Sequence, residues 1–264
     1  MVMTDGLPEG STAKVEPLQA RTSAKRVPEY RVYNQPGFVL HSRPYGETSL
    51  IIEVFTRDYG RVGLVAKGVR RPGSKLRNAL QTFQPLELGW TGKSELKVLT
   101  AAEWVGGMLP LGNAALFYGF YLNELLLKLL AREDPHQGLY DEYVSALTRL
   151  ATSAEDASAL RLFEMALLRE TGVAADLSID VENQTPVDPD AFYVVDPQRG
   201  PRPAHEMDEL PKVSGKTLLA MARGDYSDVV TQKQGKQLMR HLLAFHLNGV
   251  PLQTRKILMD LREL

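Results

Sequence analysis

The sequence of 264 residues predicts an α+β fold, in which a small β-barrel precedes an α-helical bundle and a short C-terminal region of irregular structure and helices. Three observations predict it. β-branched and aromatic residues occur in short runs between turn residues from Gly37 to Trp104. After Pro110 the apolar residues recur with a helical period, and residues 173–211 then lose that period and gain Pro, Asp and Gly. A hydrophobic content of 44% is sufficient for a buried core.

Residues 37–105 are the predicted barrel. The stretch FVLHSRPYGETSLIIEVFTRDYGRVGLVAKG contains strand-like runs, with a hairpin turn at Asp58-Tyr59-Gly60. Two more runs, FQPLELGWTG and ELKVLTAAEW, are joined by a turn at Thr91-Gly92-Lys93. About five short strands fit an OB-fold barrel better than a two-sheet sandwich, which needs about seven. Residues 1–36 are predicted to be a flexible tail outside the fold, because they mix Gly, Pro, Ser, Thr and both charge signs without an apolar run.

Residues 106–172 are predicted to form the helical bundle. The segment 116–130 is apolar almost all the way round, as expected for a helix enclosed by others. A second helix has one apolar stripe from Leu139 to Leu150, and a third runs through residues 160–167 and ends at Gly172. An acidic loop or hairpin is expected over residues 173–211. Helices that pack on the bundle are expected over residues 212–264.

The net charge of -1 hides a strong segregation of charge along the chain. Residues 37–105 carry 10 basic and 6 acidic side chains, and residues 212–264 carry 9 and 4. Residues 106–171 carry 5 and 9, and residues 172–211 carry 2 and 9. Two basic regions therefore flank an acidic middle, which favours an anionic partner that touches only part of the surface. Solvated charges sorted by chance are the alternative interpretation.

Composition excludes several classes of site. With no cysteine, disulfides, thiolate zinc sites, iron-sulfur clusters and a cysteine nucleophile are all excluded, and a reducing compartment, the cytoplasm, is expected. The longest apolar region, residues 117–130, contains Asn123, Glu124 and Lys128, so no contact with a membrane is expected.

The segment GVRRPGSK, residues 68–75, resembles a phosphate-binding loop. Gly68 and Gly73 have the spacing of a P-loop, but Ser74-Lys75 stand in the reverse of the required order and no βαβ unit surrounds them. A nucleotide site is therefore disfavoured. Basic residues nevertheless gather around this segment, and on a barrel they could form one groove for a polynucleotide backbone. The predicted DNA-binding residues here are Arg61, Lys67, Arg70, Arg71, Lys75, Arg77, Lys93 and Lys97. A solvated turn is the plainer alternative.

A second basic stripe is predicted near the C-terminus. Lys233, Lys236 and Arg240 lie at i, i+3 and i+7, on the helical face opposite Leu238, Leu242 and Phe245. It is either a second DNA-binding surface or the wet side of an amphipathic helix.

No motif in the sequence indicates an enzyme. His241 and His246 are five residues apart, which places them on different sides of a helix and not at one metal ion. There is no G-x-S-x-G nucleophile motif and no calcium-binding loop of the D-x-[DN]-x-[DN]-G type. We expect no enzymatic activity, no metal and no cofactor.

The barrel sequence quoted above, from residue 38 to residue 68, and its continuation to residue 103 resemble the bacterial RecO family of recombination and repair proteins. The resemblance continues through LFYGFYLNELLLKLL, LRLFEMALLRETG and NGVPLQTRKIL, and so covers nearly all of residues 37–258. It implies an OB-fold followed by a helical bundle, binding to single- and double-stranded DNA, and annealing of complementary strands in the cytoplasm, at the nucleoid. It also implies that the protein works with RecR to load RecA onto strands coated by single-stranded DNA-binding protein. Many family members have a cysteine zinc site in the region of residues 172–211; this chain has no cysteine, so zinc is not expected.

The resemblance also implies a site for the acidic, hydrophobic C-terminal tail of single-stranded DNA-binding protein. The helix of residues 116–132 fits such a tail, because several leucines lie close to one side and two cations lie near its C-terminal end. The predicted partner-binding residues are Leu122, Leu125, Leu126, Lys128, Leu129 and Arg132. The alternative is that these leucines are ordinary bundle core.

Two other functions remain open from the residues. An RNA-binding OB-fold protein would use the same basic barrel; the sequence has no feature that reads a 2′-hydroxyl, so competition between RNA and DNA would separate the two. A protein-protein adaptor that does not bind DNA would use the helical bundle alone.

Overall fold

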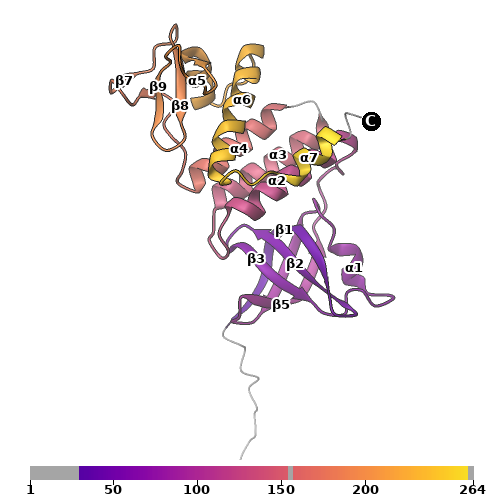
Figure 1. Ribbon diagram of the computed structural model, residues 1–264. Coiled ribbons are helices and arrows are strands. Elements are labelled where there is room, and N and C mark those ends of the chain that lie inside the picture. Colours follow the sequence, from indigo (N-terminus) through magenta and orange to yellow (C-terminus); the bar gives the residue numbers. More distant parts are fainter. Residues whose placement is uncertain (1–29, 154–156, 261–264) are drawn as a thin grey trace, which may run out of the picture.

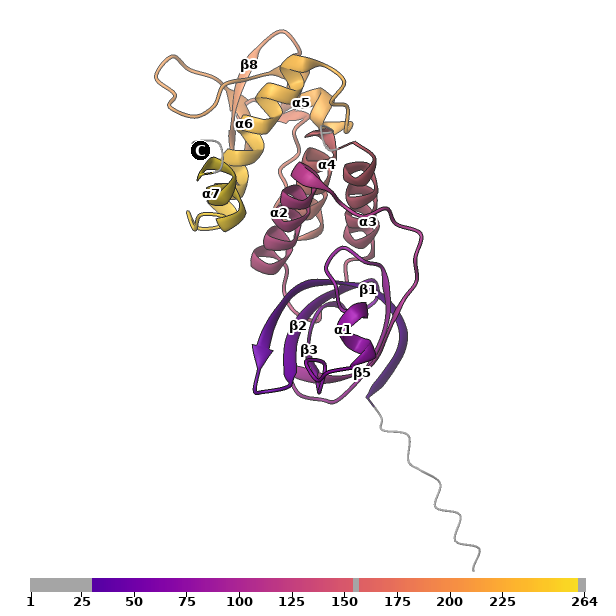
Figure 2. The same cartoon turned by 90° about the vertical axis from the view of Figure 1, so that its right-hand side faces the viewer.

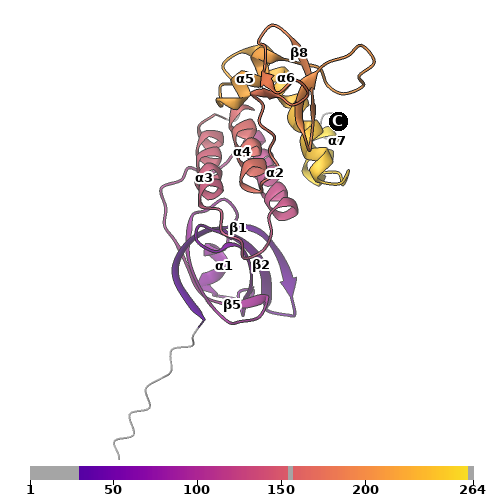
Figure 3. The same ribbon diagram turned by 90° about the vertical axis from the view of Figure 1, so that its left-hand side faces the viewer.

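The computed structural model describes residues 30–153 and 157–260 and places a barrel, a helical bundle and a C-terminal lobe one after another (Figure 1). The barrel is formed by residues 30–104, the bundle by residues 113–170 and the lobe by residues 173–247. Figure 3 shows the helices of the bundle between the barrel and the lobe.

Five strands close the barrel in the order β1-β2-β3-β5-β4. The strands are β1 (Arg31–Tyr45), β2 (Ser49–Thr56), β3 (Gly60–Ala66), β4 (Leu86–Thr91) and β5 (Leu96–Trp104), with α1 (Lys75–Ala79) between β3 and β4. Neighbouring strands are antiparallel except β3 and β5, which are parallel. The order and count confirm the predicted OB-like barrel, and both predicted hairpin turns are present, with positive φ at Gly60 and Gly92.

The interior of the barrel is filled by the branched and aromatic residues that mark its strands in the sequence. Ile52, Val54, Val62, Leu64 and Trp90 form one buried cluster inside it. Their alternation along each strand gives every strand one face toward this cluster.

The barrel begins earlier in the chain than the sequence predicted. β1 starts at Arg31, and residues 31–36 pair with β4, whereas the sequence predicted the barrel to begin at residue 37. The register of this pairing shifts between Val32 and Gln35, and Asn34 has a φ of 49°. This irregularity breaks the period-two pattern that would have marked the strand. Residues 1–29 of the predicted tail lie outside the described residues.

Three helices form the bundle: α2 (Asn113–Leu129), α3 (Gln137–Thr152) and α4 (Ala157–Glu170). The predicted apolar stripe on α3 is buried, and α4 ends before Gly172, which has the positive φ expected of a glycine after a helix. α2 contacts β1, α3, α4 and α7 (Gln253–Asp260), which explains why its sequence is apolar nearly all the way round.

The C-terminal lobe combines small sheets with helices. Its strands are β6 (Ile179–Asp180), β7 (Thr185–Pro186), β8 (Phe192–Asp196), β9 (Gly200–Pro203) and β10 (Val213–Ser214), and its helices are α5 (Gly215–Ala222) and α6 (Val229–His246). The hairpin expected near residues 191–201 is β8 and β9. Aspartates hold the turns: Asp180 accepts backbone hydrogen bonds from Glu182 and Asn183, and Asp196 accepts one from Gln198. Among the side chains described within residues 30–153 and 157–257, no three or more His, Asp or Glu gather as metal ligands.

The barrel and the bundle share one hydrophobic core. Phe38 of β1 and Phe55 of β2 point out of the barrel and pack on Tyr140 and Tyr143 of α3, with ring centroids 5.3–5.9 Å apart. Asn123 of α2 links the two parts as well: its Nδ2 donates to the Leu40 carbonyl at 2.9 Å, and its Oδ1 accepts from the Tyr143 hydroxyl at 2.6 Å. The outer face of β1 and β2 is therefore covered by the bundle.

Candidate nucleic-acid interface

Five of the predicted DNA-binding residues lie together at one end of the barrel. We call residues 67–77, the segment that links β3 to α1 and continues into it, the basic loop. Its cations are all exposed: Lys67, Arg70, Arg71, Lys75 and Arg77. In Figure 2 the strands form a ring behind α1, so α1 and the basic loop lie at one end of the barrel.

Backbone hydrogen bonds fix the shape of the basic loop. Arg71 N donates to the Gly68 carbonyl at 3.1 Å, and Ser74 N donates to the Arg71 carbonyl at 3.2 Å. Gly68 and Gly73 have φ values of 67° and 75°, which a residue with a Cβ rarely adopts. These two turns bend the short segment that carries the five cations. α1 has only five residues, so the loop lacks the long helix that follows a P-loop.

The basic loop is also anchored to the turn between β1 and β2. Arg70 N donates to the Thr48 carbonyl at 2.8 Å, and the Arg70 guanidinium donates to the Gly46 carbonyl at 3.4 Å. This contact adds two exposed side chains at the end of β1, Arg43 and Tyr45. Arg43 lies outside the cluster predicted from the sequence, which ran from Arg61 to Lys97. The turn between β1 and β2 was the feature that could have indicated that Arg43 lies near the basic loop.

No carboxylate neutralises the cations of the basic loop. Among the described residues, none of the five makes an ion pair. Their charges therefore remain available to an anion from outside the protein, and several cations close together suit the regular spacing of phosphates along a nucleic acid.

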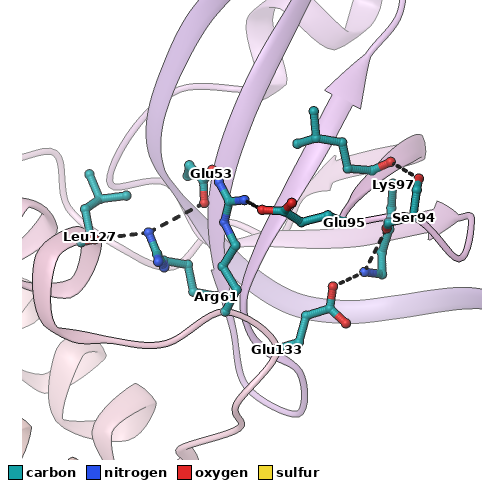
Figure 4. A network of polar contacts seen from close by, with 9 residues as sticks. Glu53, Arg61, Ser94, Glu95, Lys97, Leu127 and Glu133 are labelled. Carbon is teal, nitrogen blue, oxygen red and sulfur yellow. Dashed lines mark hydrogen bonds and ion pairs between the residues drawn. The ribbon is translucent and has the colours of Figure 1, made fainter.

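Arg61 and Lys97, two of the predicted DNA-binding residues, are paired within the protein and do not belong to the basic loop. Both belong to an ion network at the junction of barrel and bundle, which Figure 4 shows. Arg61 donates to the Leu127 carbonyl at 3.0 Å and lies 3.8 Å from the Glu53 carboxylate, and Lys97 is paired with Glu133. Both cations are largely buried, and burial lowers the pKa of Arg61 while the charge of Glu53 opposes that change. Their charges hold the two domains together.

Arg132 belongs to the same network, which corrects its predicted role in binding a partner. It pairs with Glu53 of β2 and with Glu95 in the turn between β4 and β5. The backbone nearby follows β3: Glu133 N donates to the Arg61 carbonyl at 2.9 Å, and Gly60 lies so close that a Cβ there would be 1.9 Å from the Asp134 carbonyl oxygen. The segment between α2 and α3 is thus clamped onto the barrel. We call Glu53, Arg61, Glu95, Lys97, Arg132 and Glu133 the junction network.

The leucines predicted to bind a partner are bundle core. Leu122, Leu125 and Leu126 are each 0% exposed, so that prediction is wrong for all three and the alternative is confirmed. Leu129 packs against the same core, and Lys128 lies 3.9 Å from Glu124 on its own helix. The sequence could not separate these cases, because a helix surrounded by its own protein and one awaiting a partner are both apolar.

The second basic stripe lies far from the basic loop. Lys233, Lys236 and Arg240 are exposed on α6, opposite the buried Leu238 and Leu242. Phe245, expected on the buried side, is exposed instead. Figures 1 and 2 both place α6 above the bundle and α1 below it, so the structure separates the two predicted basic surfaces. Lys93 is exposed in the turn between β4 and β5.

Comparisons with known proteins agree with this architecture. The family model described as recombination protein O N terminal matches residues 31–108, starting where β1 starts, and recombination protein O C terminal matches residues 114–256. A DNA repair protein RecO of Ralstonia nicotianae is 55% identical over 260 residues, which cover 98% of this chain and 94% of that protein. Another, from Burkholderia pseudomallei, is 54% identical over 258 residues, 97% of this chain and 94% of that protein. A third, from Polynucleobacter asymbioticus, is 53% identical over 241 residues, 89% of this chain and 98% of that protein.

Proposed function

Since this chain belongs to the RecO family of DNA repair proteins, we propose that it binds single- and double-stranded DNA through the basic loop and anneals complementary strands. One observation carries the proposal: five exposed cations without a carboxylate partner among the described residues lie on one short loop. Lys and Arg that neutralise phosphates release bound counterions, which is the main source of sequence-independent affinity for nucleic acids.

Annealing needs two strands to be held close while their charges are screened. The basic loop and the basic stripe of α6 are separate surfaces, so each could hold one strand. Cations at both surfaces reduce the repulsion between the two phosphate backbones. We propose that this screening is the whole of the activity, and that the protein acts without enzymatic chemistry and without a nucleotide.

The proposed partners follow from the family. The protein works with RecR to load RecA onto strands coated by single-stranded DNA-binding protein, in the cytoplasm at the nucleoid. The tail of that protein needs a site other than the one first predicted, because Leu122, Leu125 and Leu126 are core and Arg132 is paired within the junction network. No described helix is long and apolar enough to cross a membrane.

Equilibrium binding of labelled single-stranded and duplex oligonucleotides tests the proposed site. The triple variant Arg70→Ala, Arg71→Ala, Lys75→Ala is compared with a control triple variant in the C-terminal lobe, Arg199→Ala, Lys212→Ala, Lys216→Ala, which removes the same number of exposed charges. Loss of affinity for both DNAs is expected in the first variant and not in the second. Equal binding by both variants and the wild type would remove the basic loop from the site.

The same assay separates the two other functions. An adaptor that does not bind DNA would give no binding of either oligonucleotide by the full chain at low salt. An RNA-binding protein would release bound DNA more readily to an RNA competitor of equal length than to a DNA competitor.

A further inference from the structure

The face that an OB barrel most often offers to nucleic acid is closed in this protein. Oligonucleotides commonly lie across strands 2 and 3 of such barrels, between the loops that join strands 1 to 2 and 4 to 5. Here Phe55 of β2 packs on α3, and the segment between α2 and α3 is clamped on β3 through the junction network. A Cβ at Gly63 of β3 would already lie 3.8 Å from the Arg132 guanidinium carbon. A bound DNA strand must therefore pass over other parts of the barrel.

One exposed group of side chains lies at the end of the barrel opposite to the basic loop. Tyr30, Arg31 and Tyr33 come from the start of β1, and Lys93 comes from the turn between β4 and β5; we call them the tyrosine cluster. Two contacts join the two segments: Gly92 N donates to the Tyr30 carbonyl at 3.2 Å, and Arg31 pairs with Thr91 in the sheet. β1 runs from this cluster to the turn that anchors the basic loop, so the two sites lie at opposite ends. Figure 3 shows the barrel from the side away from α1.

The aromatic rings of the tyrosine cluster face solvent. Tyr30 is 49% exposed and Tyr33 is 56% exposed, so neither belongs to the hydrophobic core. A cation lies over each ring: Lys93 Nζ is 4.1 Å from the centroid of Tyr30, and the Arg31 guanidinium carbon is 4.9 Å from that of Tyr33. These contacts hold the rings in place while leaving part of each open.

The charges of the tyrosine cluster are also free of carboxylates. Within the described ranges, neither Arg31 nor Lys93 is joined to an acidic side chain. Glu95, the acidic residue of the same turn, is paired with Arg132 instead. The cluster thus presents two exposed rings and two cations.

We propose that the tyrosine cluster is a second DNA contact, which stacks unpaired bases of a single strand on Tyr30 and Tyr33 while Arg31 and Lys93 meet the adjoining phosphates. The inference rests on the proposed DNA binding. Every base offers a flat face for stacking, so this contact is independent of sequence. A duplex keeps its bases stacked on one another, so the cluster distinguishes a single strand from a duplex, which the basic loop does not.

Paired substitutions test the stacking. Tyr30→Ala with Tyr33→Ala is compared with Tyr30→Phe with Tyr33→Phe, by fluorescence anisotropy on an oligo-dT strand and on a duplex of equal length. The alanine variant is expected to bind oligo-dT at least about tenfold more weakly and the duplex as well as the wild type does, since one stacked base contributes about that factor. The phenylalanine variant keeps the rings and should bind oligo-dT like the wild type.

The outcomes separate this inference from the proposed function. If the alanine variant binds oligo-dT as tightly as the wild type does, the tyrosine cluster is not a contact, although DNA binding stands. If the wild type binds neither DNA, both proposals fail together. If oligo-rU displaces oligo-dT and the alanine substitutions weaken the binding of oligo-rU only, the cluster is an RNA site and the assignment to DNA is overturned.

Crosslinking of the wild-type protein decides the case even if the alanine variant does not fold. An oligo-dT strand that contains 4-thiothymidine should crosslink at Tyr33, within the tryptic peptide of residues 32–57, since trypsin does not cleave between Arg43 and Pro44. Crosslinks confined to the basic loop would contradict the proposal.

Discussion

Removing three cations from the basic loop should change how DNA binding depends on salt. For a single strand, the logarithm of the binding constant falls with the logarithm of salt concentration by about 0.7 for each phosphate neutralised. The five exposed cations Lys67, Arg70, Arg71, Lys75 and Arg77 therefore give a slope of about -3.5. The variant Arg70→Ala, Arg71→Ala, Lys75→Ala should have a slope of about -1.4.

Fluorescence anisotropy of a labelled oligo-dT strand, titrated at several salt concentrations, measures both slopes. Between 50 and 200 mM salt the wild type should lose about 100-fold in affinity and the triple variant about sevenfold. Contributions from the basic stripe of α6 or from Arg31 and Lys93 would steepen both slopes equally, so the difference of about two units is the decisive quantity. The control variant Arg199→Ala, Lys212→Ala, Lys216→Ala should match the wild type. Equal slopes for the wild type and the basic-loop variant would refute the reasoning.

Three further predictions concern contacts that stabilise the fold, two at the junction of barrel and bundle and one within the C-terminal lobe. Phe55→Ala should lower the free energy of unfolding by about 3–5 kcal/mol, because it leaves a cavity where the buried ring packs on α3. Urea unfolding measures this loss, and a loss below about 1 kcal/mol would contradict the shared core. Arg132→Ala should lower the free energy of unfolding by about 1–3 kcal/mol, because it leaves the largely buried Glu53 with a weaker partner. It should not change DNA affinity, and a loss of affinity would show that Arg132 contributes to DNA binding as well as to the junction network. The Arg202 guanidinium donates a hydrogen bond to the Asp208 carboxylate and lowers the pKa of Asp208 to about 2, below that of an unfolded aspartate. The stabilisation from this contact is therefore complete above about pH 4 and disappears as the pH falls toward 2. Asp208→Asn should remove this part of the acid sensitivity of the lobe, measured by amide exchange, and an unchanged acid profile would argue against it.

The fold could be predicted where local sequence patterns decide it. The alternating runs that became β2, β3, β4 and β5 each carry their own turn signals, and the helical period of α3 is clear in its leucines. The start of β1 could not be predicted, because the register shift beside Asn34 removes the alternation there. That segment becomes a strand only through pairing with β4, more than fifty residues later.

The exposed cations of the candidate site could be predicted from the sequence only where they form no ion pair in the fold. The cations of the basic loop are exposed as expected, because their own loop contains no acidic residue. Arg61, Lys97 and Arg132 have the same residue types, but the fold brings each of them to a carboxylate that is distant along the chain or on another strand, such as Glu53 and Glu133. Which cations remain free depends on tertiary pairing, and counting charges along a sequence cannot show it.

Annealing of complementary oligonucleotides, both coated with the cognate single-stranded DNA-binding protein and without added ATP, tests the central claim most directly. The wild type and the control variant Arg199→Ala, Lys212→Ala, Lys216→Ala should accelerate annealing, and the variant Arg70→Ala, Arg71→Ala, Lys75→Ala should be slower by at least about tenfold, since each lost phosphate contact weakens the hold on the strand. A basic-loop variant that anneals as fast as the wild type, or a wild type that anneals only when ATP is added, would contradict the account.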